Sequence, residues 1–241
     1  MKYIRLILIK LLTWFFEFVY PIENKKVFSK NMKRAVNLYA DGGFDGLFAK
    51  IRMWDAPYKE IEKMVPKKGI VVDLGSGDGL LSNYLAIEST QRKVIGFENN
   101  KERVKRAEKG LKNTIFKEAD ILNVDFPKAE CFLLIHVFHH LSKKSDQKKL
   151  LLKIRKSIKG SLIVAEISEK PFLKFIFSVF TDFLIVPILF GEKLVDTNVH
   201  YRKDKEWRKL FTECGFEVKR VSFPHRGMPF SHVLYECRKS S

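Results

Sequence analysis

The stretch Ile70-Val71-Val72-Asp73-Leu74-Gly75-Ser76-Gly77-Asp78-Gly79 decides the fold class of this 241-residue chain. Apolar and β-branched residues run directly into three glycines at alternate positions, and apolar residues at helical spacing follow from Leu80. This order predicts a strand, a tight turn and a helix. Glycine lets the backbone approach a ligand closely, and the N-terminus of the helix directs free N–H groups at it. The stretch therefore predicts a nucleotide-binding loop.

Strands and helices are predicted to alternate beyond this loop. After the strand at 70–74, the pattern predicts strands at 93–98, 114–118, 131–137, 161–167, 216–223 and 233–238, and helices at 101–111, 148–158 and 204–214. Short apolar strands separated by helices are typical of a parallel sheet that is covered on both faces. We therefore expect an α/β fold with a doubly wound, mostly parallel, seven-stranded sheet.

The composition sets limits on partners and compartment. A formal net charge of +17 attracts the phosphates of nucleic acid or of anionic lipid, although lysines spread over solvated faces would give the same total. Cys131, Cys214 and Cys237 lie in apolar segments without metal-ligand spacing. This usage predicts buried free thiols in the cytoplasm, with no metal site and no disulfide framework.

The N-terminal segment 4–20 is nearly all apolar and predicts an amphipathic helix. The polar arc of this helix consists of Lys2, Arg5, Lys10, Thr13 and Glu17, and the apolar face opposite consists of Leu8, Leu11, Trp14, Phe15, Phe18 and Val19. Lys10 near the middle of a spanning helix would cost about 2.5–3.5 kcal/mol. We therefore expect the helix to lie on the inner face of an anionic membrane, aided by lysines that follow it. Packing on the protein's own core is the alternative.

A second apolar run covers 172–190 and has a narrow polar stripe that includes Lys174 and Asp182. If strands of one sheet lie on both sides of this run, a single membrane span is excluded, because both ends stay on one side. We expect an interfacial helix or a lid over the substrate site, with a core helix as the alternative. The predicted organisation is a membrane-associating helix at 1–22, a helical extension at 23–64, and a main domain at 65–241 with a lid insertion at 171–195.

Glu98 supplies a second feature of a nucleotide site. It ends the second predicted strand, 19 residues past Gly79 (98 − 79), where a carboxylate accepts hydrogen bonds from both ribose hydroxyls. With these residues the chain resembles the class I S-adenosylmethionine-dependent methyltransferases over about 65–238. The resemblance implies that the cofactor contacts Asp73, Gly75, Ser76, Gly77, Gly79, Glu98, Asn99, Asp120, Ile121 and His136.

Three further segments resemble methyltransferases of the small-molecule, quinone and lipid type. They are Val-Phe-His-His-Leu at 137–141, the helix at 206–211 and the turn at 214–216. The segment after the fourth strand is not the Asn-Pro-Pro-Tyr type that would suggest methylation of nucleic-acid or protein nitrogens. The resemblance thus implies a lipophilic small-molecule acceptor, and a nucleic-acid partner is disfavoured.

Candidate catalytic groups follow the fourth predicted strand. His136 occupies a position where relatives often have an aspartate, and its imidazole either deprotonates a hydroxyl acceptor or is a hydrogen-bonded spectator. His139 and His140 either cap the strand and helix ends or reach the acceptor. Tyr201, at the edge of the predicted lid, either orients the acceptor or only packs in its loop.

These features favour methyl transfer from S-adenosylmethionine to a lipophilic or membrane-associated small molecule. Two alternatives stay open. One is a methyltransferase that acts on RNA or protein and is attracted by the positive charge. The other is a non-catalytic relative that binds cofactor or membrane and organises partners.

Overall fold

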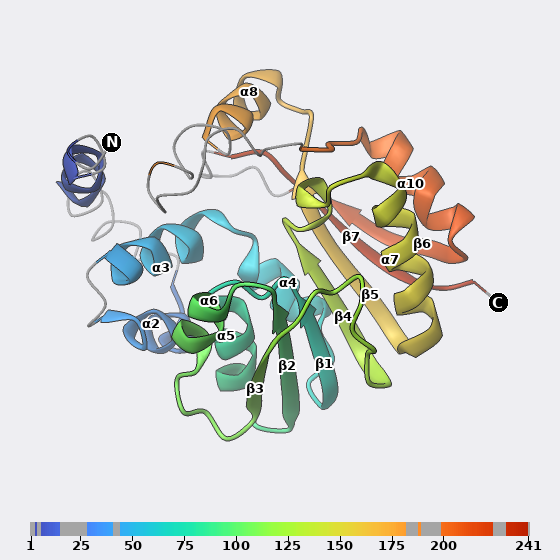
Figure 1. The fold of residues 1–241 in the computed structure, drawn as a ribbon, viewed down its shortest axis with the longest axis horizontal. Coiled ribbons are helices and arrows are strands. Elements are labelled where there is room, and N and C mark those ends of the chain that lie inside the picture. Colours follow the sequence, from blue (N-terminus) through green and yellow to red (C-terminus); the bar gives the residue numbers. More distant parts are fainter. Residues whose placement is uncertain are drawn as a thin grey trace.

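A seven-stranded sheet forms the centre of the molecule in the computed structural model, which describes residues 3, 6–14, 28–40, 44–181, 188, 199–223 and 230–240 (Figure 1). The strands are β1 (Gly69–Leu74), β2 (Arg92–Glu98), β3 (Thr114–Glu118), β4 (Ala129–Ile135), β5 (Ile158–Ile167), β6 (Phe216–Ser222) and β7 (His232–Lys239). Their order is β3-β2-β1-β4-β5-β7-β6; β7 pairs antiparallel with both β5 and β6, and the other neighbouring strands pair parallel. The predicted fold class is confirmed.

The helices cover both faces of this sheet. They are α2 (Lys30–Asn37), α3 (Phe44–Asp55), α4 (Tyr58–Met64), α5 (Leu80–Glu88), α6 (Lys101–Ala107), η2 (Phe138–His140), α7 (Lys144–Ser157), α8 (Phe172–Phe180) and α10 (Asp204–Glu213). The strand order reverses between β1 and β4, whose carboxyl ends therefore border a crevice. Ligands of open α/β sheets bind in such a crevice.

Side chains that alternate along the strands pack into two hydrophobic cores, one on each face of the sheet. Val71 and Leu133 point to one face and pack with α2, α3, α4 and α5, whereas Val72 and Phe132 point to the other face and pack with α7 and α10. This parity follows from the two-residue period of a strand. The described part of the N-terminal extension thus shares its core with the sheet.

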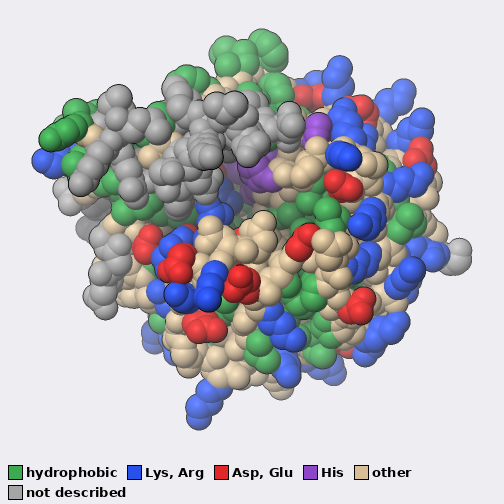
Figure 2. All heavy atoms as spheres, in the orientation of Figure 1, with side chains coloured by type: hydrophobic (Ala, Val, Ile, Leu, Met, Phe, Trp, Pro, Cys, Tyr) green, Lys and Arg blue, Asp and Glu red, His purple; other side chains and the backbone are tan. Residues whose placement is uncertain are grey.

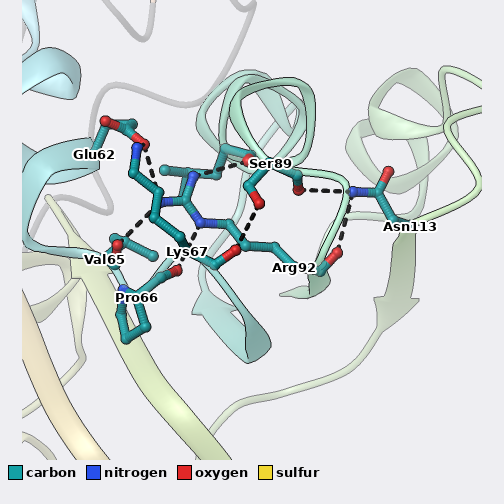
Figure 3. A network of polar contacts seen from close by, with 8 residues as sticks. Glu62, Val65, Pro66, Lys67, Ser89, Arg92 and Asn113 are labelled. Carbon is teal, nitrogen blue, oxygen red and sulfur yellow. Dashed lines mark hydrogen bonds and ion pairs between the residues drawn. The ribbon is translucent and has the colours of Figure 1, made fainter.

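Arg92 ties the extension to the sheet at the end opposite the crevice (Figure 3). Its guanidinium is fully buried and donates to the backbone oxygens of Pro66, Leu85 and Val65 at 2.8–3.0 Å. It also pairs with Glu62 at 2.9 Å, and the same carboxylate oxygen contacts Lys67. A buried guanidinium with four hydrogen bonds, one of them to a carboxylate, holds α4 on the domain.

Two predicted boundaries differ from the structure for visible reasons. Helix α6 ends at Ala107 rather than at 111, because Glu108 leaves helical geometry with ψ of 99°. Strand β4 ends at Ile135 rather than at 137, because His136 adopts a positive φ of 58° and turns the chain out of the sheet.

Apolar side chains remain exposed on α8 and on the described part of the N-terminal helix, residues 6–14. These side chains are Leu6, Ile7, Leu11 and Trp14 on the N-terminal helix and Phe172, Leu173, Ile176, Phe177 and Phe180 on α8. We call them the apolar rim; Figure 2 shows green side chains at both places. Within the described ranges, the helices are too short or too polar to cross a bilayer. The predictions for 1–2, 4–5, 15–27, 182–187 and 189–195 lie outside the described residues.

Candidate functional site

The turn after β1 has the backbone geometry that requires glycine. Gly75, Gly77 and Gly79 have φ of +72°, +54° and +73°, a region that side chains with a Cβ rarely adopt. A Cβ on Gly75 would lie 2.7 Å from Val137 Cγ2, whereas a Cβ on Gly77 would meet nothing within 4 Å. Gly77 therefore faces open space, which is what a loop that receives a ligand needs.

Glu98 lies directly against this turn. Its Oε2 accepts a hydrogen bond from the Gly77 N–H at 3.0 Å, and its Oε1 accepts one from the Asn100 N–H at 3.0 Å. The Ala119 N–H donates to the Glu98 backbone oxygen at 2.8 Å, which brings the exit of β3 to the same place. The expected closeness of the glycine turn and Glu98 is therefore present. A carboxylate oxygen has two lone pairs, so each keeps capacity for a ligand hydroxyl.

The residues expected around adenine lie at the exit of β3. Asp120 is exposed, and its carboxylate accepts hydrogen bonds from Leu122 N–H at 2.9 Å and Asn123 Nδ2 at 2.6 Å. Asn99 is exposed beside Glu98, whereas the Ile121 side chain is buried in the core. Asp120 is therefore next in sequence to Ala119, whose N–H donates to the backbone oxygen of Glu98.

Asp73 is a buried carboxylate at the end of β1. Burial, opposed by a 2.7 Å hydrogen bond from Ser82 Oγ and reinforced by the charge of Glu98, raises the pKa of Asp73 to about 6. Ionisation of the Asp73 carboxyl therefore lowers the stability of the ligand-free protein. A positively charged ligand group beside it would remove part of that cost.

A cavity of about 460 Å³ opens at the carboxyl ends of β1 and β4. One wall is the glycine turn, and the others carry histidines and aromatic rings. The lining includes Asp73, Gly75, Ser76, Gly77 and Asp78, the histidines His136, His139, His140 and His232, and the rings of Phe48, Trp54, Tyr58, Phe177 and Phe230. Figure 2 shows histidine side chains in a hollow near the centre of the face. This volume is typical of small-molecule sites.

His136 occupies a strained position at the cavity wall. Its φ of 58° is unusual for a residue with a Cβ, and its N–H is held by Ala165 O at 2.8 Å. Burial and the neighbouring His232 lower the pKa of His136 well below the usual value, so its ring is neutral at pH 7. Its Nε2 is buried and has no hydrogen-bond partner among the described residues.

His139 is oriented by a buried carboxylate. Its Nδ1 lies 2.5 Å from Glu166 Oε2, and the other Glu166 oxygen accepts the Phe138 N–H at 2.9 Å. Both side chains are 1% exposed. Tyr201 stacks on the His139 ring with centroids 5.1 Å apart. A carboxylate on Nδ1 assigns the proton to that atom and leaves Nε2 as the basic nitrogen.

The structure brings about half of the predicted site residues to the cavity. Asp73, Gly75, Ser76, Gly77, His136 and His139 line it, whereas Gly79, Glu98, Asn99, Asp120, Ile121 and Tyr201 do not. Glu98 contacts the glycine turn by accepting the Gly77 N–H, and Tyr201 contacts the site by stacking on His139. Among the described residues, the cavity included, no three metal-binding side chains are grouped to hold an ion.

Three functional candidates at or behind the cavity wall were not revealed by the sequence. Asp55, which ends α3, and His232, which begins β7, line the cavity. Glu166, inside the apolar strand β5, contacts the lining residue His139 from behind. Asp55 belongs to the segment 52–58, which contains aromatic and polar side chains just before the domain. The aromatic and polar side chains of this segment could have indicated Asp55. Glu166 and His232 are single polar residues in strands, and such residues give no sequence signal.

Comparison with known protein families supports this geometry. A family described as a methyltransferase domain matches residues 66–215, more than half of the chain. No curated protein sequence matches the chain. The chain belongs to the methyltransferase-domain family, in the class that uses S-adenosylmethionine as methyl donor.

Solved structures show the same fold at low sequence identity. The mitomycin 7-O-methyltransferase MmcR has a TM-score of 0.64 at 18% identity, over 90% of this chain and 62% of that one. Human N-acetylserotonin methyltransferase, solved with S-adenosylmethionine, has 0.60 at 21%, over 85% and 58%. The Synechocystis PCC 6803 magnesium protoporphyrin IX methyltransferase ChlM, with bound S-adenosylhomocysteine, has 0.60 at 15%, over 88% and 100%. The chain thus spans about three fifths of the first two.

Proposed function

We propose that this enzyme methylates a lipophilic small molecule that reaches the cavity from a membrane surface. The observation that carries the proposal is the composition of the cavity wall. The glycine turn forms one side, and the aromatic rings of Trp54, Phe177 and Phe230 form another. Leu12 and Phe177, which line the cavity, come from the two helices that carry the apolar rim. An apolar acceptor is the chemistry that such walls favour.

The residues around the turn fit S-adenosylmethionine. Glu98 would bind the ribose hydroxyls, and Asp73 would lie near the charged methionine portion beside the backbone of Gly75, Ser76 and Gly77. Gly79, Asn99, Asp120 and Ile121 would complete the adenosine side, and His136 would face its reactive end. The open space at Gly77 and the costly charge of Asp73 support this assignment. The bound cofactor supplies a methyl group on a positively charged sulfur.

His139 is the group best placed to remove a proton from a hydroxyl acceptor. Glu166 fixes its tautomer, so that Nε2 accepts the proton while the carboxylate stabilises the charged ring. Tyr201 holds the ring plane by stacking. His136, neutral and without a partner on Nε2 among the described residues, offers a hydrogen bond to the acceptor oxygen. Positioning then supplies much of the rate, since the acceptor is held in line.

Membrane attachment is supported by the apolar rim. Phe172 and Leu173 are 67% and 81% exposed, and Lys170 beside them is exposed as well. Trp14 and Lys10 repeat the combination on the N-terminal helix. Aromatic and aliphatic side chains next to lysines are typical of helices that lie in the interface of an anionic bilayer.

The substrate class is tested by incubating the protein with labelled S-adenosylmethionine and the separated lipid, RNA and protein fractions of the source cell. We expect label in the lipid fraction. Label only in RNA or protein would contradict the proposed acceptor class, and cofactor binding without any transfer would favour the non-catalytic alternative.

Membrane attachment is tested by vesicle flotation with and without anionic lipid. A Phe172→Glu and Leu173→Glu double variant is expected to bind at least tenfold more weakly, because burying each side chain contributes roughly 1.5–3 kcal/mol. The matched control is Leu152→Glu, which changes an exposed leucine on α7. Wild-type protein that stays with neither vesicle, or an equal loss in the control, would contradict the attachment.

A further inference from the structure

Tyr39, a residue of the N-terminal extension, contacts the glycine turn that follows β1. Its hydroxyl donates a hydrogen bond to the Asp78 backbone oxygen at 2.6 Å. Asp78 lies between Gly77 and Gly79, and both Asp78 and Tyr39 line the cavity. Tyr39 is 3% exposed and belongs to the core that α2 shares with α5. The two residues are 39 positions apart, so the contact forms only when the extension packs against the domain.

Asn83 on α5 fixes the direction of this hydrogen bond. Its Nδ2 donates to the Tyr39 hydroxyl oxygen at 2.9 Å and to the Ala107 backbone oxygen at 2.9 Å. A backbone oxygen can only accept, which assigns Nδ2 to this side of the amide. Burial raises the pKa of Tyr39, so the phenol keeps its proton. The hydroxyl therefore accepts from Asn83 and donates to Asp78.

Tyr39 completes the restraints on one peptide group of the turn. The Gly79 N–H donates to the Ser76 oxygen at 2.9 Å, and the oxygen of the same peptide group, Asp78 O, accepts from Tyr39. The Asp78 side chain is also held, by Arg106 Nη2 at 2.8 Å. Glycines lose more backbone entropy than other residues when they become ordered. A turn that is restrained before the ligand arrives loses less entropy on binding and binds more tightly.

The extension also supplies part of the cavity wall. Helix α3 contributes Phe48, Ala49 and Trp54 to the lining. The start of this helix packs directly on Tyr39, because a Cβ on Gly46 would lie 2.8 Å from the Tyr39 backbone oxygen. Tyr39 thus contacts the cavity wall on one side and the glycine turn on the other.

We propose that Tyr39 is a positioning residue for the cofactor, which holds the glycine turn in the geometry that binds S-adenosylmethionine and so couples docking of the extension to cofactor affinity. The proposal rests on the proposed cofactor site at the turn and does not depend on the acceptor. Such coupling is reciprocal. Bound cofactor therefore stabilises the docked extension by the same factor by which the docked extension tightens cofactor binding.

Calorimetry with S-adenosylhomocysteine tests the effect on affinity in the full chain. We expect Tyr39→Phe to bind about three- to tenfold more weakly, the range that one hydrogen bond spans. The matched control is Tyr235→Phe, which removes the hydroxyl of another buried tyrosine, one that donates to Asp204 at 2.8 Å. Its affinity should equal that of the wild type. Asn83→Ala removes the orienting amide and serves if Tyr39→Phe does not fold, as judged by circular dichroism, with an expected loss of about threefold.

Hydrogen exchange of the α2 amides tests the coupling itself. We expect S-adenosylhomocysteine to slow exchange in α2 of the wild type, and to slow it at least threefold less in Tyr39→Phe. A hydroxyl that only stabilised the fold would change the exchange rates of the free protein but not the effect of the ligand on them.

Three results would overturn the proposal. They are an unchanged affinity in Tyr39→Phe, an equal loss in Tyr235→Phe, and the same slowing of α2 exchange by the ligand in Tyr39→Phe and wild type. Gly77→Ala distinguishes this failure from failure of the cofactor site. If Gly77→Ala weakens binding and Tyr39→Phe does not, only the positioning role is contradicted; if neither weakens binding, the proposed cofactor site at the turn is contradicted as well.

Discussion

The buried carboxylate of Asp73 gives a prediction with opposite signs for stability and for binding. Burial raises its pKa from 3.8 to about 6, and Glu98 adds to the effect while Ser82 opposes it. The difference of about two pKa units, at about 1.4 kcal/mol each, makes ionised Asp73 cost about 3 kcal/mol in the free protein. Replacement by asparagine, which is neutral and still accepts from Ser82, should stabilise the protein at neutral pH.

The sign follows from the two pKa values. Well below pH 3.8 the carboxyl is protonated in both folded and unfolded states, so its ionisation costs no stability. As pH rises from about 4 to 6, the unfolded chain ionises first and the folded state loses stability, and above that range the loss is complete. Asp73→Asn should therefore gain about 1–3 kcal/mol of unfolding free energy at pH 7.5 and only about 0.5 kcal/mol at pH 4.

Urea unfolding at the two pH values measures this difference, with Asp125→Asn, an exposed carboxylate, as the control. Calorimetry with S-adenosylhomocysteine measures the cost to function, which we expect to be a 10- to 100-fold weaker Kd, since a hydrogen bond to a charged group contributes about 1.5–3 kcal/mol. The reasoning is refuted if Asp73→Asn is less stable than wild type at pH 7.5, or if its gain is the same at pH 4.

Three other substitutions test separate parts of the structure. Gly77→Ala should weaken S-adenosylhomocysteine binding at least tenfold by calorimetry while changing unfolding free energy by only about 1–2 kcal/mol, because its Cβ fills open space at positive φ; unchanged affinity would contradict the role of the turn. Arg92→Met should lower the unfolding free energy by about 3 kcal/mol in urea, because Glu62 keeps only Lys67 and the backbone oxygens that Arg92 binds lose their donor; a change below 1 kcal/mol would contradict this. Glu166→Gln should reduce kcat on a hydroxyl acceptor about 100-fold, because His139 loses its orienting carboxylate; an equal loss in cofactor affinity would indicate a structural role instead.

Local patterns were sufficient to predict the fold and the cofactor half of the site. The glycine turn predicts a strand before it and a helix after it, and Glu98 ends the next strand. Parallel pairing of β1 and β2 therefore brings the turn and Glu98 together. These relationships depend only on local sequence and on the pairing of two consecutive strands. For this reason the seven strands and the contact between Gly77 and Glu98 were predictable.

The acceptor half depends on contacts between distant segments. Asp55 and His232 meet only because the end of α3 lies against the start of strand β7, 177 residues away along the chain. Glu166 resembles an ordinary strand residue until β5 is placed beside β4. His136 was expected inside a strand, and its positive φ appears only once the chain leaves the sheet for η2.

The central claim is that the glycine turn and Glu98 hold one adenosine whose methyl donor end faces the histidine-lined cavity. A crystal structure with S-adenosylhomocysteine tests it most directly. We predict ribose hydroxyls within hydrogen-bond distance of Glu98, the adenine beside Asp120, and the sulfur directed at the cavity next to His136. A ligand bound elsewhere, or a Glu98 carboxylate that makes no contact with the ribose, would contradict the account.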